Sequence, residues 1–168
     1  MGYMGSGKST IGKSISSRLQ LTFIDLDNYI EQREDSSIKE IFKNKGEIYF
    51  RIKEAFYLKE ILDTKTNYVL SLGGGTPCYG TNMDLIKEST AISYYLRANI
   101  PTLVARLQNG KENRPLIATL NDEQLLEYIG KHLFERAPFY EQAAIKININ
   151  DVTIEEISEA ILSKLNTQ

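Results

Sequence analysis

The chain has 168 residues, of which 42% are hydrophobic and 25% charged, and its formal net charge is −2. This balance is typical of a soluble globular protein and lacks the basic excess that general nucleic-acid binding requires. Cys78 and His132 are the only residues of their types, which excludes an internal disulfide framework and a multi-histidine metal site. No apolar run reaches membrane-spanning length, and no signal peptide opens the chain. We therefore expect a cytoplasmic enzyme or binding module that contacts neither nucleic acid nor a membrane.

Helical and extended patterns alternate along the chain. Helices are expected over 8–19, where apolar residues recur at four-residue spacing, and over 37–62 with a break near Gly46. Further helices are expected over 83–89, from Pro101, from Asn121 and after Thr153, and strands over 22–26, 68–72, 91–96 and 145–149. Strands that alternate with helices indicate an α/β fold in which a parallel sheet is covered on both faces. No repeat or linker divides the chain, so residues 1–168 are expected to form a single domain.

One polar segment interrupts this alternation. Residues 109–119 contain Gly110 and Pro115 and show no apolar period. A loop of this length is often functional, for example as a lid over a site. We therefore expect a lid over about 109–119.

The chain opens with a phosphate-binding pattern. Gly2 to Ser9 read G-Y-M-G-S-G-K-S, which matches G-x-x-x-x-G-K-[ST], and a helical pattern follows directly. Glycines let backbone N–H groups turn toward phosphate oxygens, Lys8 supplies a positive charge, and the Ser9 hydroxyl can ligate Mg²⁺. A glycine-rich tail is the alternative interpretation. A P-loop also joins a strand to a helix, and no strand is visible before Gly2.

Two aspartates end the first expected strand. Asp25 and Asp27 are two residues apart, so in an extended chain they face the same side. The carboxyl ends of parallel strands point toward the ligand crevice. One carboxylate could hold magnesium through water and the other could accept a proton from an attacking hydroxyl. Capping of the following helix by Asp27 is an equally weighted alternative.

Two further features could bind a ligand. Arg51 is expected on a helix, where most arginines are solvated and cover apolar surface with their stems. Gly73, Gly74 and Gly75 end a hydrophobic strand and would let a substrate approach the backbone closely. The alternative for this glycine run is a flexible turn.

Taken together, these motifs resemble the shikimate kinase family. The resemblance covers nearly the whole chain and consists of G-K-S-T-I-G, D-L-D, F-R-I-K-E, G-G-G, R-P-L-I and E-R-A-P-F-Y in this order. It implies transfer of the ATP γ-phosphate to the 3-hydroxyl of shikimate, with Mg²⁺ as cofactor. It also implies a three-layer P-loop kinase fold whose parallel sheet has five strands, with a substrate-binding helical region over about 28–62.

The resemblance also implies roles for individual residues. Lys8, Asp27 and Arg114 would be catalytic, with Asp27 acting on the substrate hydroxyls and Arg114 coming from the lid onto the phosphates. Ser9 and Asp25 would serve the metal. Nucleotide binding would fall to Gly5, Ser6, Gly7, Lys8, Ser9, Thr10, Arg114 and Thr153, with Arg106 and 150–153 near adenine. Shikimate would be bound by Asp27, Arg51, Gly73, Gly74, Gly75 and Arg136, because planar guanidinium groups bind a carboxylate bidentately.

The start of the chain departs from the family pattern. Members of the family carry an apolar strand before the first P-loop glycine, at the centre of the sheet, whereas here only Met1 precedes Gly2. We expect the given sequence to be shortened at its N-terminus. We also expect four parallel strands, with a gap at the centre or a substitute filling it.

Two other functions remain open at this point. A gluconate kinase-like enzyme would share the P-loop, and a truncated nucleotide-binding module without catalysis would explain the absent strand. The paired arginines and the glycine run favour a carboxylated ring as substrate. A monomer that binds shikimate and ATP is the expected form.

Overall fold

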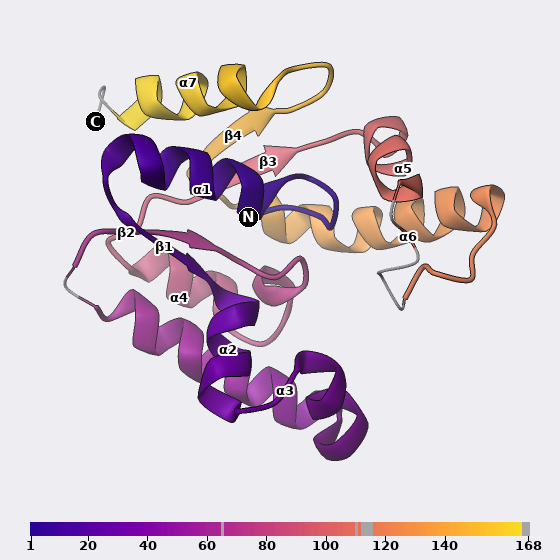
Figure 1. Cartoon of the computed structure of the whole chain (residues 1–168), viewed down its shortest axis with the longest axis horizontal. Helices are drawn as coiled ribbons and strands as arrows, with labels where there is room; N and C mark the ends of the chain where they lie inside the picture. The colour runs from indigo at the N-terminus through magenta and orange to yellow at the C-terminus, as the bar shows by residue number, and fades with distance from the viewer. Residues whose placement is uncertain (65, 110, 112–115, 166–168) are drawn as a thin grey trace.

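A computed structural model describes residues 1–64, 66–109, 111 and 116–165 (Figure 1). The elements follow in the order α1 (Lys8–Leu19), β1 (Thr22–Asp25), α2 (Leu26–Glu34), α3 (Ile38–Leu62), β2 (Tyr68–Ser71), the 3-10 helix η1 (Thr76–Cys78), α4 (Asn82–Glu88), β3 (Tyr94–Arg97), α5 (Ile100–Gln108), α6 (Asp122–Tyr140), β4 (Ile145–Asn148) and α7 (Ile154–Leu165). Strands and helices alternate as predicted.

Local side-chain hydrogen bonds set several helix boundaries. Ser37 with Glu40, and Asn121 with Gln124, form reciprocal capping boxes that begin α3 and α6. The expected break in α3 lies at Gly46, whose φ of 82° and ψ of 171° are not helical. Glycine permits this turn at low cost because it has no Cβ.

The structure adds helix α2 to the predicted elements and corrects two predicted boundaries. Helix α2 begins directly after β1, and its N-cap is Asp25, not Asp27, because the Asp25 side chain accepts a hydrogen bond from the Asp27 amide. The third strand starts at Tyr94 rather than at residue 91. Its partner strand β4 begins opposite Tyr94, at Ile145, so the preceding apolar residues have no ladder in which to pair.

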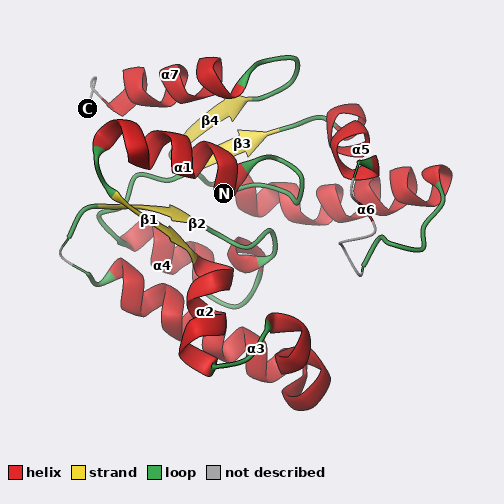
Figure 2. Ribbon diagram, in the orientation of Figure 1, coloured by secondary structure: helices red, strands yellow, loops and turns green. Residues whose placement is uncertain are grey.

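Within the described residues, four strands form two separate parallel pairs. β1 pairs with β2 from Thr22 opposite Tyr68 onward, and β3 pairs with β4 from Tyr94 opposite Ile145 onward. Figure 2 shows α1 and α7 on one side of the strands and α3 and α4 on the other. The predicted four parallel strands and three-layer arrangement are thus confirmed.

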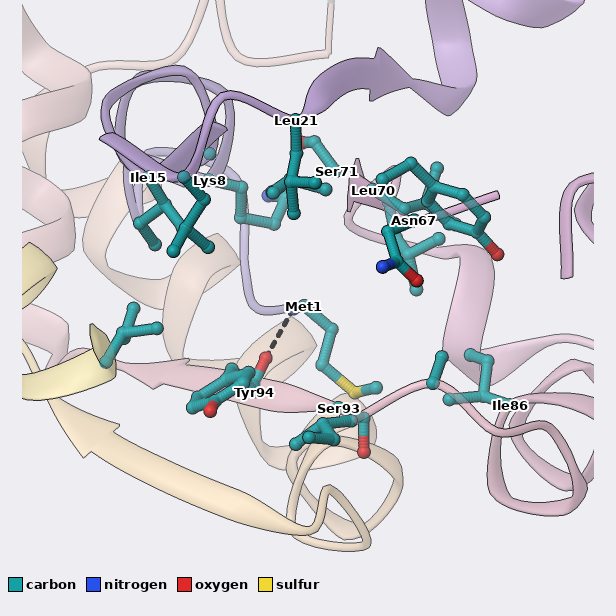
Figure 3. A pocket seen from close by; sticks show the side chains of 18 of the residues that line it. Met1, Lys8, Ile15, Leu21, Asn67, Leu70, Ser71, Ile86, Ser93 and Tyr94 are labelled. Carbon is teal, nitrogen blue, oxygen red and sulfur yellow. Dashed lines mark hydrogen bonds between the residues drawn. The ribbon is translucent and has the colours of Figure 1, made fainter. Parts of the chain in front are cut away.

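A cleft of about 440 Å³ lies between β2 and β3, at the predicted gap (Figure 3). Its lining is mostly apolar, from both strand edges and from α1. Met1 is one of the residues that line it. The Met1 α-amino group donates to the Tyr94 carbonyl, and the Met1 carbonyl accepts from the Leu96 amide at 2.9 Å. Met1 therefore pairs opposite Tyr95 as a single parallel strand residue.

Two apolar clusters flank this cleft. One joins α1, β3 and β4 with α5, α6 and α7, and the other joins β1 and β2 with α2, α3 and α4. Met1 packs against both clusters. Within the described residues, no helix is long and apolar enough to cross a membrane.

Candidate functional site

The phosphate loop has a backbone that only glycine adopts readily. Gly2, Gly5 and Gly7 have φ values of 148°, 80° and 85°. A Cβ on Gly5 would lie 2.9 Å from Cγ of Leu107, so both backbone conformation and space require glycine there. The loop is closed by a hydrogen bond of 3.2 Å from the Ser6 amide to the Tyr3 carbonyl.

The N-terminus of α1 is suited to an anion. Its N-cap, Gly7, makes no side-chain cap, and its first turn carries no acidic residue. Lys8 lies across the loop, where its Nζ donates to the Tyr3 carbonyl at 3.0 Å, and Thr10 is exposed on the first turn. Ser6 is fully buried within the loop. The helix dipole, the loop amides and the lysine together favour a bound phosphate group.

The two residues predicted for metal binding are in direct contact. Ser9 Oγ donates to Asp25 Oδ2 at 2.7 Å, and Ser71 Oγ lies 3.4 Å from the same hydroxyl. The contact forms because β1 ends beside the first turn of α1. Hydroxyl and carboxylate oxygens suit Mg²⁺, which usually takes few protein ligands and keeps waters and phosphate oxygens. The oxygen donors present therefore fit the magnesium ion that a phosphate loop implies.

Asp27 lies between the phosphate loop and the glycine run. Burial, the negative charge of Asp25 and then that of Glu54 raise the pKa of Asp27 to about 6, whereas the Lys8 ammonium acts in the opposite direction. A carboxyl group with such a pKa is mostly ionised at neutral pH and can still accept a proton efficiently.

The three glycines after β2 each face a different part of the site. A Cβ on Gly73 would lie 2.8 Å from Asp27 Oδ1, and one on Gly74 would lie 3.3 Å from the Met4 amide nitrogen. A Cβ on Gly75 would lie 3.4 Å from both terminal nitrogens of Arg51. The flexible-turn interpretation does not account for this arrangement, in which the run brings the acid, the loop and the arginine together.

Arg51 is held from several sides on α3. Its Nη1 donates to Glu54 at 2.9 Å, and its Nε and Nη2 donate to Glu47 at 3.3 Å. Glu54 is 1% exposed and also accepts from Thr76 Oγ1 at 2.7 Å. Arg51 is therefore an ordered guanidinium at the site, not a solvated surface arginine.

Arg136 approaches the same region from α6. Its guanidinium lies 5.7 Å from the ring centroid of Tyr3, and its charge acts on Tyr140, whose hydroxyl donates to the Gly74 carbonyl. The charges of Arg136 and Arg51 both act on Cys78. Burial nevertheless raises the pKa of the Cys78 thiol to about 11, so it remains protonated.

Several predicted residues are not joined to this group. Arg114 and the expected lid residues 110, 112, 113 and 115 lie outside the described residues; in the described part of the lid, Ile117 is buried. Thr153 forms a capping box with Glu156 at the start of α7. Arg106 donates to the Ile149 carbonyl at 3.2 Å.

Sequence reasoning missed several residues that contact the site, among them Ser71 beside Ser9, and Glu54, Tyr79 and Tyr140. Glu54 and Tyr79 both contact Arg51, and Tyr140 contacts Gly74. Glu54 and Tyr140 carried a local signal, because each lies three or four residues after a predicted arginine on the same helix, Arg51 on α3 and Arg136 on α6. Tyr79 reaches Arg51 from a distant segment.

These features define a P-loop kinase that transfers a phosphoryl group to a small molecule. A phosphate loop, a serine–aspartate pair, a buried carboxylate and two guanidiniums meet at the carboxyl ends of β1 and β2. Deoxyadenosine kinase from M. mycoides shares this fold, at a TM-score of 0.57 and 22% identity.

Comparison with known proteins identifies the family. The chain matches the shikimate kinase family over residues 4–166. It is 46% identical to the shikimate kinase of Flavobacterium johnsoniae over 98% of this chain and 96% of that protein. The crystal structure of shikimate kinase from Bacteroides thetaiotaomicron has a TM-score of 0.91 at 36% identity, covering 99% of this chain and 96% of that one. Shikimate kinase from Acinetobacter baumannii, in complex with shikimate, has a TM-score of 0.82 at 31% identity, covering 99% and 90%. The chain belongs to the shikimate kinase family.

Proposed function

We propose that this protein transfers the γ-phosphate of ATP to the 3-hydroxyl of shikimate, giving 3-phosphoshikimate and ADP in aromatic amino acid biosynthesis. The observation that carries the proposal is the position of Asp27, between the phosphate loop and the glycine run that reaches Arg51. Family membership and the shikimate complex of a relative support the same substrate. The proposed enzyme acts as a monomer in the cytoplasm, where ATP is available.

The phosphate loop is assigned to ATP. The amides of Gly5 to Lys8 and the dipole of α1 would hold the phosphates, and Thr10 lies on the same first turn. The Lys8 ammonium would leave the Tyr3 carbonyl for a phosphoryl oxygen. A charge–charge contact of this kind strengthens as negative charge develops during transfer. Thr153 and Arg106 are assigned to the adenosine end on the resemblance alone.

Ser9 and Asp25 are assigned to Mg²⁺. The serine hydroxyl and the Asp25 carboxylate would hold the ion beside the phosphate loop. The bound ion would neutralise charge on the phosphate oxygens. The first turn of α1 and the end of β1 hold both oxygens in place, which supports this assignment.

The two arginines are assigned to the carboxylate of shikimate. A planar guanidinium offers paired N–H donors that match a carboxylate, and Arg51 is already oriented by Glu54. Arg136 would approach from the α6 side, and the backbone of Gly73 to Gly75 would lie beside the ring. The hydroxyls at the other end of shikimate would then reach Asp27.

Asp27 is assigned the role of proton acceptor. Its carboxylate would hydrogen-bond the 3-hydroxyl and take its proton as the oxygen attacks the γ-phosphorus. The proton would move from the hydroxyl to an Asp27 oxygen while the bond between the γ-phosphorus and the bridging oxygen breaks toward ADP. Arg114, from the lid segment, is proposed to stabilise the transferred group and to help exclude water.

A coupled assay of ADP release tests this function. With ATP and Mg²⁺ present, we expect turnover that depends on shikimate and that Asp27→Asn lowers by two orders of magnitude or more, as is typical of a lost general base. The matched control is Asp84→Asn, an exposed carboxylate on α4, which leaves turnover unchanged. Turnover with gluconate but not shikimate would assign a different small-molecule kinase. ATP binding without turnover on either would assign a nucleotide-binding module.

A further inference from the structure

The ring of Tyr79 covers one face of the Arg51 guanidinium. The central carbon of the guanidinium lies 3.6 Å from the centroid of the Tyr79 ring, the shortest cation–π distance among the described residues. At this distance the charged group is in contact with the π face. Such contacts stabilise a desolvated cation by more than an exposed one.

This contact leaves the N–H donors of Arg51 available. A guanidinium has five N–H groups, and the hydrogen bonds to Glu54 and Glu47 use three of them. Two donors suffice for one bidentate carboxylate. A ring against the face of the group restrains its plane without competing for those donors, whereas a further carboxylate would occupy them.

The backbone that carries Tyr79 is tied to the same network. Tyr79 follows η1, whose first residue, Thr76, donates to Glu54 Oε1 at 2.7 Å. Glu54 Oε2 accepts from Arg51. A Cβ on Gly75 would lie 3.3 Å from the Tyr79 ring and 3.4 Å from the Arg51 terminal nitrogens, so glycine lets the ring and the guanidinium stay close together.

We propose that Tyr79 is a positioning residue for the substrate carboxylate, because its ring stacks on Arg51 and holds the plane of the guanidinium. The inference rests on the proposed function, in which Arg51 binds the carboxylate of shikimate. Tyr79 acts through Arg51 and takes no part in phosphoryl transfer. Its loss affects KM for shikimate and leaves kcat and KM for ATP near their parental values.

Three variants separate stacking from packing. Tyr79→Phe keeps the aromatic face and retains the parental KM for shikimate. Tyr79→Leu keeps much of the apolar bulk and raises this KM about fivefold to tenfold, the range expected for a cation–π contact that is partly desolvated. Tyr79→Leu in an Arg51→Lys background adds less than twofold, because lysine has no plane to orient. A parental KM in Tyr79→Leu, or a full additional effect in the Arg51→Lys background, overturns the positioning role.

A second measurement does not depend on turnover. In the parent, the ring current of Tyr79 shifts the NMR signal of the Arg51 Nε–H, which Arg51→Lys identifies by its loss. Tyr79→Leu moves this signal, and Tyr79→Phe does not. An unmoved signal in Tyr79→Leu refutes the stack even if the parent is active. Absence of shikimate-dependent ADP release from the parent refutes the proposed function instead.

Discussion

The carboxylate of Asp27 lies against the backbone of Gly73, so closely that a Cβ on Gly73 would be 2.8 Å from Oδ1 of Asp27 and 2.9 Å from Oγ1 of Thr76. The glycine is needed for space, since its φ is not in the left-handed region. The pair joins the end of β2 to the start of α2 and sets where the acid points.

Gly73→Ala is expected to displace Asp27 and to lower kcat at least tenfold. The added methyl group requires a shift of the Asp27 carboxylate or of the Gly73 backbone, and overpacking of this kind costs about 1–3 kcal/mol of folding stability. Steady-state kinetics and thermal unfolding measure the two effects. Gly130→Ala on α6 is the matched control, because a Cβ there meets Ile100 only at 3.7 Å. That control keeps its activity and gains stability, as alanine in a helix should.

Asp27→Asn is expected to stabilise the fold while it removes activity. The carboxyl pKa rises from 3.8 to about 6 on folding, so the folded state binds more protons than the unfolded state between these values. Ionised Asp27 therefore costs stability above pH 6, and the cost disappears below about pH 4. The amide removes it, which adds about 1–2 kcal/mol at pH 7 after allowance for solvent screening.

Thermal unfolding across pH tests this linkage. The difference in Tm between Asp27→Asn and the parent is positive at pH 7 and falls toward zero near pH 4. In the parent, kcat/KM for shikimate falls as the pH drops through about 6, because the proton acceptor of the free enzyme becomes protonated. A constant Tm difference across this range would contradict a raised pKa at Asp27.

Arg51→Lys is expected to raise KM for shikimate at least tenfold and to change KM for ATP by less than twofold. Lysine keeps the charge but loses the paired donors and the flat face that Tyr79 covers. Arg97→Lys is the matched control, because Arg97 is 62% exposed and pairs with Glu141 on the surface. Equal weakening of both substrates in Arg51→Lys would indicate a general disturbance of the fold.

Much of the fold and part of the site could be predicted from the sequence, because the signals are local. The phosphate loop, the Gly46 break and the capping boxes each depend on residues within a few positions of one another. The contact of Ser9 with Asp25 was predictable from strand polarity, since β1 ends at the same edge as the loop.

The contacts around Arg51 could not be predicted in the same way. Tyr79 reaches the guanidinium of Arg51 from a distant segment of the chain, and nothing in the residues next to Tyr79 indicates this contact. The choice of Asp25 over Asp27 as helix cap depends on where β1 stops pairing with β2. Both are decided by tertiary packing rather than by local pattern.

Extending the chain ahead of Met1 by five apolar residues is expected to raise Tm and to abolish one pH dependence. Burial, and then the charge of Lys8, lower the pKa of the Met1 α-ammonium from 8.0 to about 5. The unfolded chain therefore binds more protons between these values, and the stability contributed by this group falls as the pH drops from 8 toward 5. A peptide N–H at the same position keeps the bond to the Tyr94 carbonyl without a charge. The added residues would also pair in the cleft between β2 and β3.

Unfolding at pH 7 and 8 isolates Met1, because Asp27 titrates near pH 6 and the lowered pKa of His132 lies below 6.5. We expect the parent to lose stability from pH 8 to pH 7 and the extended chain to keep it. Equal Tm values for the two chains at both pH values would contradict the pairing of the added residues in the cleft between β2 and β3.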